Sequence, residues 1–374
     1  MTEIRPFRIE IPQSDLDDLQ ARLALTHWAD SLPGDAAEKD LPEGIERPPG
    51  WDYGVPTDYL KGLVAYWRDG YDWRAWEARL NGYPQFTTTI DGQNVHFLHL
   101  RSGQPDALPL ILTHGWPGSI VEYLNVIEPL TSQGFDLVIP SIPGYGFSGP
   151  TTEAGWDNYR IAAAWVELMR RLGYTRYGAV GNDAGSMISP EVGRLDPVAV
   201  VGVHVTQVFS FPSGDPSEFQ GLSEEEQAGL GVLNWFWQNL GAFNQLQSQQ
   251  PQTLGHALTD SPAGLLGWNS QLLGPDLDHD FVLTNTMLYW LTGTANSSIR
   301  LYYENARATP PTGPTTVPLG VAMGAGDFIS IRRFAERDHS NITSWHRYPS
   351  GSHYQAHLEP AQLSNDIVEF FRSL

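Results

Sequence analysis

Residues 176–195 read RYGAVGNDAGSMISPEVGRL and contain the pattern that decides the fold. The segment RYGAV is typical of a buried strand, and MISPEVGRL is able to begin a helix. Between them, Gly181 and Gly185 flank the carboxylate of Asp183 in a bend that only small residues permit. Because an ordinary turn needs no such crowding, we infer that this bend displays Asp183 at the end of a strand.

The segments around this bend alternate between strand-like and helical patterns. A helical pattern, YRIAAAWVELMRRLGY, covers residues 159–174, and Asp91-Gly92 within QFTTTIDGQNVHFLHL is a strong hairpin signal. A strand followed by a helix, repeated with short links, is typical of a parallel sheet covered on both faces. Further strand-like segments lie at residues 108–118, 135–149, 198–209, 317–328 and 342–353.

Two helical regions interrupt this rhythm. We predict an α/β fold with a mostly parallel central sheet, helices on both faces, a helical cap insert and an N-terminal helical arm. The arm covers residues 1–90 and packs on the core and the cap, and the first part of the core covers residues 91–209. The cap, or lid, covers residues 210–308, and the second part of the core covers residues 309–374.

Composition excludes several functions. The formal net charge of −21 argues against binding to nucleic acid or to an anionic membrane surface, because both would repel the chain. The absence of cysteine excludes disulfides, thiolate nucleophiles and cysteine-based metal sites. No run reaches the roughly 18 to 20 apolar residues of a membrane-spanning helix. We therefore expect a soluble, cytoplasmic protein that acts on a small neutral molecule.

Asp183 carries the chemistry that the bend indicates. A carboxylate at such a position can displace an oxygen or halide at an sp³ carbon and form an alkyl ester with the enzyme. Water must then cleave the ester, which requires an oxyanion hole and a base. The backbone N–H groups of Ala184 and of Trp116, in the turn THGWPGS, would form the oxyanion hole. His353 follows the last strand as the base, and Asp327 follows the preceding strand as its orienting acid.

Taken singly, these residues have ordinary structural explanations. Asp327 would suit a turn or a helix cap, His353 would suit a loop, and His114 is best explained as packing beneath the oxyanion turn. The Gly-x-Gly of PGYGFSG lacks the dinucleotide-binding pattern, and no His, Asp and Glu set has metal-ligand spacing. We therefore expect no cofactor and no metal, whereas the order Asp183, Asp327, His353 at three strand ends favours a catalytic triad.

With these motifs in place, the chain resembles the epoxide hydrolases of the microsomal and juvenile-hormone type, which have the α/β-hydrolase fold. The resemblance implies that Asp183 is the nucleophile, His353 the base and Asp327 its acidic partner. It also implies that cap tyrosines hydrogen-bond the epoxide oxygen. The matching segments are RPFRIEIPQSDLDDLQARLALTHW, HGWPGS, GNDAGS, PQTLGHALTDSPAGLLGW, LTNTMLYWLTGTANSSIRLYYEN and GSHYQAHLEP.

Residue by residue, the chain departs from this family at three positions. The second cap tyrosine falls on Tyr302, but Phe243 stands where the family has its first. The residue after the nucleophile, usually Trp, is Ala184, which leaves space beside Asp183. The usual Gly before the nucleophile is Asn182. The resemblance thus implies an intact nucleophile but only one of the family's two ring-opening tyrosines. It also implies a site that accommodates a bulky apolar epoxide.

The cap supplies further candidates for contact with the substrate. Phe243, Trp235 and Tyr303 are expected to bind the substrate, and Tyr303 or a water is an alternative proton donor. The expected partners are a small-molecule epoxide and water, with no nucleic acid and no membrane, and the chain could form a homodimer.

Other functions stay open from the sequence. The leading hypothesis is an epoxide hydrolase that gives a vicinal diol. A haloalkane dehalogenase would use the same nucleophile, but Ala184 lacks the indole N–H that often binds the departing halide. A non-catalytic binding protein is favoured by Phe243 and opposed by the intact set Asp183, Asp327 and His353. Intramolecular epoxide opening by a substrate hydroxyl is a further alternative.

Overall fold

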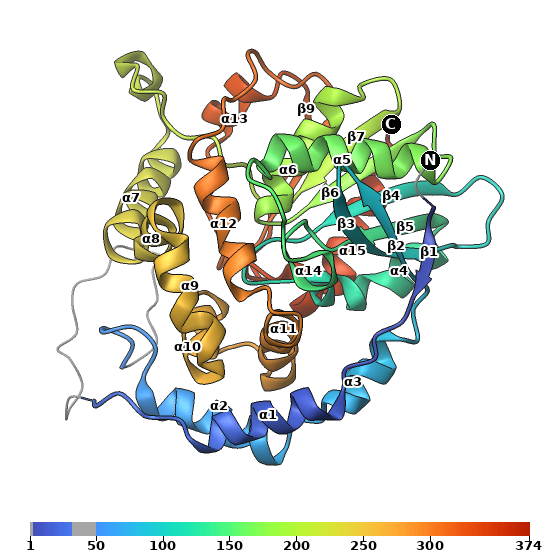
Figure 1. Ribbon diagram of the computed structural model, residues 1–374. Coiled ribbons are helices and arrows are strands. Elements are labelled where there is room, and N and C mark those ends of the chain that lie inside the picture. Colours follow the sequence, from blue (N-terminus) through green and yellow to red (C-terminus); the bar gives the residue numbers. More distant parts are fainter. Residues whose placement is uncertain (1–2, 32–49) are drawn as a thin grey trace.

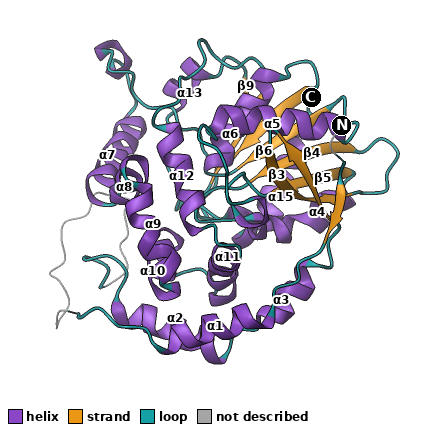
Figure 2. Cartoon of the chain, in the orientation of Figure 1, coloured by secondary structure: helices purple, strands orange, loops and turns teal. Residues whose placement is uncertain are grey.

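The computed structural model describes residues 3–31 and 50–374. Within these ranges, nine strands form one sheet in the order β1-β2-β3-β5-β4-β6-β7-β8-β9 (Figure 2). The strands are β1 (Arg5–Phe7), β2 (Gln85–Ile90), β3 (Gln93–Leu100), β4 (Leu108–Thr113), β5 (Phe135–Pro140), β6 (Tyr177–Gly181), β7 (Val200–Val205), β8 (Leu319–Met323) and β9 (Ile342–Arg347).

The sheet is mostly parallel, as the sequence predicts. Neighbouring strands from β5 to β9 pair in parallel, whereas β1, β2 and β3 pair antiparallel at one edge. The predicted hairpin joins β2 to β3, with φ of 49° at Asp91 and 76° at Gly92. Positive φ at both positions is what a two-residue hairpin turn requires, which explains the Asp-Gly pair.

Helices cover both faces of the sheet because each central strand is apolar on both sides. Leu110 and Leu112 of β4 pack into one core cluster, while Ile111 packs into the other. Helices α4 and α15 contribute to the first cluster, and α5 and α6 contribute to the second. These helices, with the short ones near them, are η1 (Ile120–Val126), α4 (Ile127–Ser132), η2 (Gly146–Ser148), α5 (Asn158–Arg171), α6 (Ala184–Leu195), α13 (Arg332–Asp338), α14 (Gln355–Leu358) and α15 (Pro360–Arg372).

A second group of helices lies between β7 and β8 along the chain. Figure 1 shows this group, in yellow to orange, beside the sheet, and the N-terminal helices pass along it. Helix α2 contacts both α10 and α11, and α1 contacts α10. The group comprises η3 (Pro216–Phe219), α7 (Glu224–Asn239), α8 (Ala242–Gln249), α9 (Pro251–Asp260), α10 (Pro262–Leu273), α11 (His279–Leu291) and α12 (Ala295–Asn305), and the N-terminal helices are α1 (Gln13–Ala24), α2 (Thr57–Asp69) and α3 (Trp73–Leu80).

The predicted N-terminal arm contains strands as well as helices. Strands β1 and β2 fall inside residues 1–90, yet both belong to the central sheet. The reason is the hairpin, because β3 carries its partner strand β2 into the sheet with it, and β1 then pairs with β2. In the part of the chain that the structure describes, no helix combines the length and apolarity needed to cross a membrane.

Asp366 fixes the C-terminal helix α15 to the sheet. Its buried carboxylate accepts hydrogen bonds from Nε2 of His204 on β7 at 2.8 Å and from Nδ1 of His346 on β9 at 2.6 Å. The hydroxyl of Tyr348 also donates to it. Burial alone would raise the pKa of Asp366, but these partners, His204 foremost, outweigh burial and lower it to about 2.

Asp366→Asn should therefore lower the free energy of unfolding at pH 7 by about 2 kcal/mol, because one pKa unit corresponds to about 1.4 kcal/mol. The folded pKa lies below the ordinary value of 3.8, so the contribution is fully present above that value and is lost as the pH falls through about 2. Urea unfolding should show that the difference in free energy of unfolding between wild type and variant becomes smaller from pH 7 down to about pH 3. A gap that stays constant over this range would contradict the assignment.

Candidate active site

Asp183 occupies the tip of the strained turn between β6 and α6. Its backbone has φ 54° and ψ −119°, in the left-handed region that side chains rarely adopt. The flanking glycines are required by close approach: a Cβ on Gly181 would lie 2.0 Å from the carbonyl oxygen of Gly185, and one on Gly185 would lie 1.8 Å from that of Thr113. The sequence-based explanation of the bend is thus confirmed in its geometry, because the crowded turn places the Asp183 carboxylate at the carboxyl end of the sheet.

The predicted oxyanion donors surround this carboxylate. The N–H of Trp116 donates to Oδ1 of Asp183 at 2.9 Å, and the backbone N–H of Ala184 also lowers the pKa of this carboxylate. Burial raises the pKa of Asp183 above its ordinary value, while His353 and these two N–H groups act in the opposite direction. Both N–H groups therefore lie where the carbonyl oxygen of an ester on Asp183 would form.

The predicted base and acid come together beside the nucleophile. Nδ1 of His353 lies 2.9 Å from Oδ1 of Asp327, and its Nε2 lies 3.8 Å from Oδ2 of Asp183. Burial disfavours the charged imidazole, but Asp327, Asp183 and Glu122 outweigh that effect and raise the pKa of His353 to about 9. The imidazole therefore carries a proton at neutral pH.

Aromatic rings form the wall above Asp183. Phe243 of α8 stacks on Trp116 at 6.1 Å between ring centroids, and Tyr302 of α12 meets both rings edge-on, at 5.9 and 6.0 Å. Burial and the charge of Asp183 raise the pKa of Tyr302 well above 10, so its hydroxyl keeps its proton. The structure thus brings the predicted tyrosine and the substituted phenylalanine into contact at the oxyanion turn.

The other two predicted substrate contacts lie elsewhere on the cap. Tyr303 follows Tyr302 on α12 and lies about 100° further around the helix. Its ring packs under the guanidinium of Arg307, 3.5 Å from the ring centroid. Trp235 is half-buried on α7. Contact of either residue with the substrate stays a prediction.

His114 packs beneath the oxyanion turn, as the sequence analysis favours. Its ring is fully buried, with Nδ1 3.0 Å from the carbonyl oxygen of Gly115 and Nε2 accepting a hydrogen bond from the N–H of Ile142. Burial lowers the pKa of His114 to about 4, so this imidazole is neutral. It therefore supports the turn and is not a second base.

Gln207, which the sequence analysis did not single out, connects the parts of the triad. Its Oε1 accepts the backbone N–H of Asp183 at 2.9 Å, and its Nε2 donates to Oδ1 of Asn182 at 2.8 Å and to Oδ2 of Asp327. Asn182 also accepts from the hydroxyl of Thr206 at 2.6 Å, which gives this departure from the family a structural role. Its position in the chain could have identified it as a site residue, because Gln207 follows β7, which lies between the strands that precede Asp183 and Asp327.

Four further polar side chains near Asp183 were also missed. The hydroxyl of Tyr289 donates to the carbonyl oxygen of Gly118 at 2.5 Å, and the charge of Asp183 contributes to raising the pKa of Tyr289. Tyr145, Tyr354 and Glu122 are likewise buried and coupled electrostatically to Asp183. Tyr289 lies in α11 and Glu122 in η1, whereas Tyr145 and Tyr354 directly precede η2 and α14, so no shared sequence pattern marks them as neighbours of Asp183.

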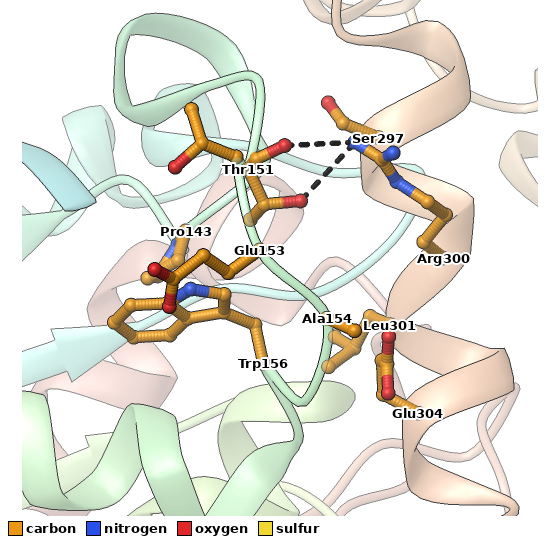
Figure 3. Close-up of a pocket in the computed structure, with 10 residues that line it drawn as sticks. Pro143, Thr151, Glu153, Ala154, Trp156, Ser297, Arg300, Leu301 and Glu304 are labelled. Atoms are coloured by element: carbon orange, nitrogen blue, oxygen red, sulfur yellow. Dashed lines mark hydrogen bonds between the residues drawn. The ribbon is translucent and has the colours of Figure 1, made fainter. Parts of the chain in front are cut away.

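A separate cavity of about 180 Å³ lies beside α12. Figure 3 shows Arg300 reaching Thr151, where its Nη2 donates to the backbone carbonyl at 3.2 Å and to the hydroxyl at 3.1 Å. Trp156, Glu153 and Glu304 also line this cavity, which includes none of the predicted triad residues. We therefore place the chemistry at the strand ends and not in this cavity.

Comparison with known proteins agrees with this geometry. The family described as "Epoxide hydrolase N terminus" matches residues 4–123, and that described as "alpha/beta hydrolase fold" matches residues 109–253. A putative epoxide hydrolase of Stigmatella aurantiaca is 40% identical, over 99% of this chain and 85% of that protein. Juvenile hormone epoxide hydrolase 1 of Ctenocephalides felis is 32% identical, over 97% of this chain and 84% of that protein. The Aspergillus niger epoxide hydrolase structure is 28% identical, with a TM-score of 0.85 over 99% of this chain and 96% of that one.

The mostly parallel sheet and the carboxylate on the turn after β6 define an α/β-hydrolase with an aspartate at the nucleophile position. The chain belongs to the epoxide hydrolase family, since the similarity to the Stigmatella and Ctenocephalides proteins covers almost its whole length.

Proposed function

We propose that this chain hydrolyses epoxides to vicinal diols through a covalent ester on Asp183. One observation carries the proposal: Oδ1 of Asp183 is held by the N–H of Trp116 at 2.9 Å, while Oδ2 faces Nε2 of His353 at 3.8 Å. One carboxylate oxygen is thereby directed into the site beside a histidine, which is the geometry that a nucleophile with a hydrolytic base requires.

In the first half-reaction, Oδ2 of Asp183 attacks an epoxide carbon, and the bond from that carbon to the ring oxygen breaks. Tyr302 gives its proton to the oxygen as negative charge develops there. Because burial keeps this hydroxyl protonated, Tyr302 is a donor and not a base. The products of this step are an alkyl ester on Asp183 and a neighbouring hydroxyl group.

In the second half-reaction, His353 takes a proton from water, and the water oxygen bonds to Cγ of Asp183. The N–H groups of Trp116 and Ala184 stabilise the oxyanion. Esterification removes the charge of Asp183, one of the groups that raise the pKa of His353. The pKa of the imidazole therefore falls once the ester has formed, so the imidazolium can return a proton to the Tyr302 phenolate and is then neutral and able to act as the base. The departing diol oxygen takes the proton held by His353, and the carboxylic acid formed on Asp183 then gives its proton to the imidazole, which restores the starting state.

The cap points to a bulky apolar epoxide as substrate. Phe243 replaces a polar hydroxyl by an apolar ring at the oxyanion turn, and Ala184 presents only a methyl group beside Asp183. The chain's net charge of −21 supports a neutral small-molecule substrate and no nucleic acid partner. A cytoplasmic location and a homodimer stay predictions from the sequence.

Tyr302→Phe should slow ester formation by about 10²-fold, because one donor to the developing alkoxide is lost. Hydrolysis of the ester should change little, since the tyrosine acts in ring opening. Single-turnover rapid quench with an aryl epoxide measures both rates. Tyr177→Phe is a matched control, because it removes a buried hydroxyl that bonds to Asp196 at the other end of β6. Equal loss in both variants would contradict the role of Tyr302.

The proposed function is tested by incubating the purified chain with a panel of aryl and bulky alicyclic epoxides and with chloroalkanes of similar size. Diol formation without halide release is the expected result. Halide release without diol would assign the nucleophile to dehalogenation. No product from any of these compounds would remove support for catalysis by this site.

A further inference from the structure

Glu122 lies beneath the oxyanion turn, in η1 directly after it. Its side chain is only 1% exposed. A Cβ placed on Gly118 would lie 2.7 Å from Oε2 of Glu122 and 3.3 Å from the ring of Tyr354. The carboxyl group of Glu122 and the Tyr354 ring therefore both lie close against the backbone of Gly118. This part of the site adjoins the histidine loop, because Tyr354 directly follows His353 in the chain and packs on its ring at 5.0 Å between centroids.

The polar atoms in this part of the site lack regular partners. Among the described residues, neither carboxyl oxygen of Glu122 nor the hydroxyl of Tyr354 has a hydrogen-bond partner, although all three atoms are buried. The side chains of Tyr123 and Asn182 lie near the carboxyl group of Glu122 and lower its pKa. Buried polar atoms are normally hydrogen-bonded, and a space lined by several of them suits a water molecule.

Electrostatic coupling places the same carboxyl group beside the reacting residues. His353 and Asp183 both act on Glu122, and Glu122 in turn acts on His353. None of the steps assigned to the triad uses Glu122. A buried acid next to the base of a hydrolytic reaction is a candidate for handling the water of that reaction.

We propose that Glu122 is a further catalytic residue, which holds the attacking water together with His353 during hydrolysis of the ester on Asp183. This inference rests on the proposed function. Glu122 accepts a hydrogen bond from one O–H of the water, and the other proton passes to Nε2 of His353 as the water oxygen bonds to Cγ of Asp183. The bond between the ester oxygen and Cγ then breaks, the departing diol oxygen takes the proton from His353, and the carboxylic acid left on Asp183 gives the second water proton to the imidazole. Glu122 keeps its own protonation state throughout, so the step balances.

The charges around Glu122 agree with a role in the second half-reaction. Burial and the charge of Asp183 raise the pKa of Glu122 to about 8, against the opposing effect of His353. The titratable groups that face it are Asp183, His353, Tyr123 and Tyr354. Once Asp183 is a neutral ester, its repulsion is lost, and the acceptor form of Glu122 is favoured in the step that activates water.

Glu122→Gln tests the proposal, because it keeps the shape of the side chain but removes the carboxylate. Single-turnover rapid quench with an aryl epoxide, followed by mass measurement of the intact protein, follows both the formation and the loss of the ester. We expect ester formation within about twofold of wild type and hydrolysis at least about 10-fold slower, so that the ester accumulates. Glu191→Gln is the matched control, since Glu191 is a mostly buried glutamate paired with Arg194 at 2.8 Å on α6, and both rates should be unchanged.

Unchanged hydrolysis in Glu122→Gln, or an equal loss in both half-reactions, would overturn the proposal. If that variant does not fold, as judged by circular dichroism, Tyr354→Phe decides, because removing the hydroxyl that lies in the same part of the site should also slow hydrolysis more than ester formation. A wild-type protein that turns epoxides over without any ester would overturn the proposed mechanism and this inference together. If the wild type forms the ester but the variants hydrolyse it at the wild-type rate, only this inference would be overturned.

Discussion

Asp183→Ala should lower kcat/KM for epoxide hydrolysis by about 10⁴-fold or more, because no ester can form without the carboxylate. The backbone N–H groups and the cap would still bind substrate, so the loss should lie mainly in kcat. Diol formation, measured by chromatography, gives the rate. Binding of a non-reactive amide analogue of the substrate gives the affinity.

Asp106→Ala provides the control for this variant. Asp106 is exposed in the loop before β4, at the end of that strand opposite the oxyanion turn, and its replacement should leave kcat/KM within about twofold of wild type. Near-wild-type turnover in Asp183→Ala would mean that another group opens the epoxide.

His353→Gln should separate the two half-reactions. Ester formation should persist, whereas ester hydrolysis should slow by about 10²- to 10⁴-fold, because the water loses its base. Mass measurement of the intact protein after mixing with an aryl epoxide should show nearly full conversion to the ester. In this variant Asp183 remains available as nucleophile, so a burst of one equivalent of bound substrate is expected.

The pH dependence of the wild type provides a second check on His353. The pKa of its imidazole is raised to about 9 in the free enzyme by Asp327, Asp183 and Glu122, which outweigh burial. Esterification removes one of these charges, so hydrolysis should rise with pH to a plateau with an apparent pKa below 9. His353→Gln should lose this dependence. A variant that retains both the rate and the profile would contradict the assignment of the base.

The proximity of Asp183, Asp327 and His353 could be predicted from sequence because all three occupy topologically defined positions. Gly181 and Gly185 indicate a crowded turn, and the backbone confirms it at Asp183 with φ 54°. The alternation of strands and helices then determines which loops meet at the carboxyl edge of the sheet. His353 and Asp327 follow from chain order alone, without knowledge of any contact.

Other parts of the site depend on orientation, which a sequence pattern does not specify. Tyr302 and Tyr303 are neighbours in the chain, but the rotation of α12 directs only Tyr302 toward Trp116 and Phe243. Gln207 appears in the sequence as an ordinary polar residue after a strand. Only the structure shows that its side chain hydrogen-bonds both to Asp327 and to the backbone N–H of Asp183. Residues of this kind are identified from the structure, where each buried polar atom can be matched to its hydrogen-bond partner.

The N-terminal region shows a similar limit for the fold. Helical spacing dominates residues 1–90, and a short edge strand such as β1 carries too few residues for a periodic signal. Its place in the sheet follows from pairing with β2, which is a long-range contact. Local patterns therefore identify the core of the sheet better than its antiparallel edge.

The central claim is that a covalent ester forms on Asp183, and a single turnover in water enriched in oxygen-18 tests it most directly. With enzyme in excess over an aryl epoxide, the account predicts that the diol takes its new oxygen from the unlabelled carboxylate. The label should then appear in the peptide that contains Asp183. A diol that is labelled in the first turnover, with an unlabelled Asp183 peptide, would show direct attack by water and would contradict the account.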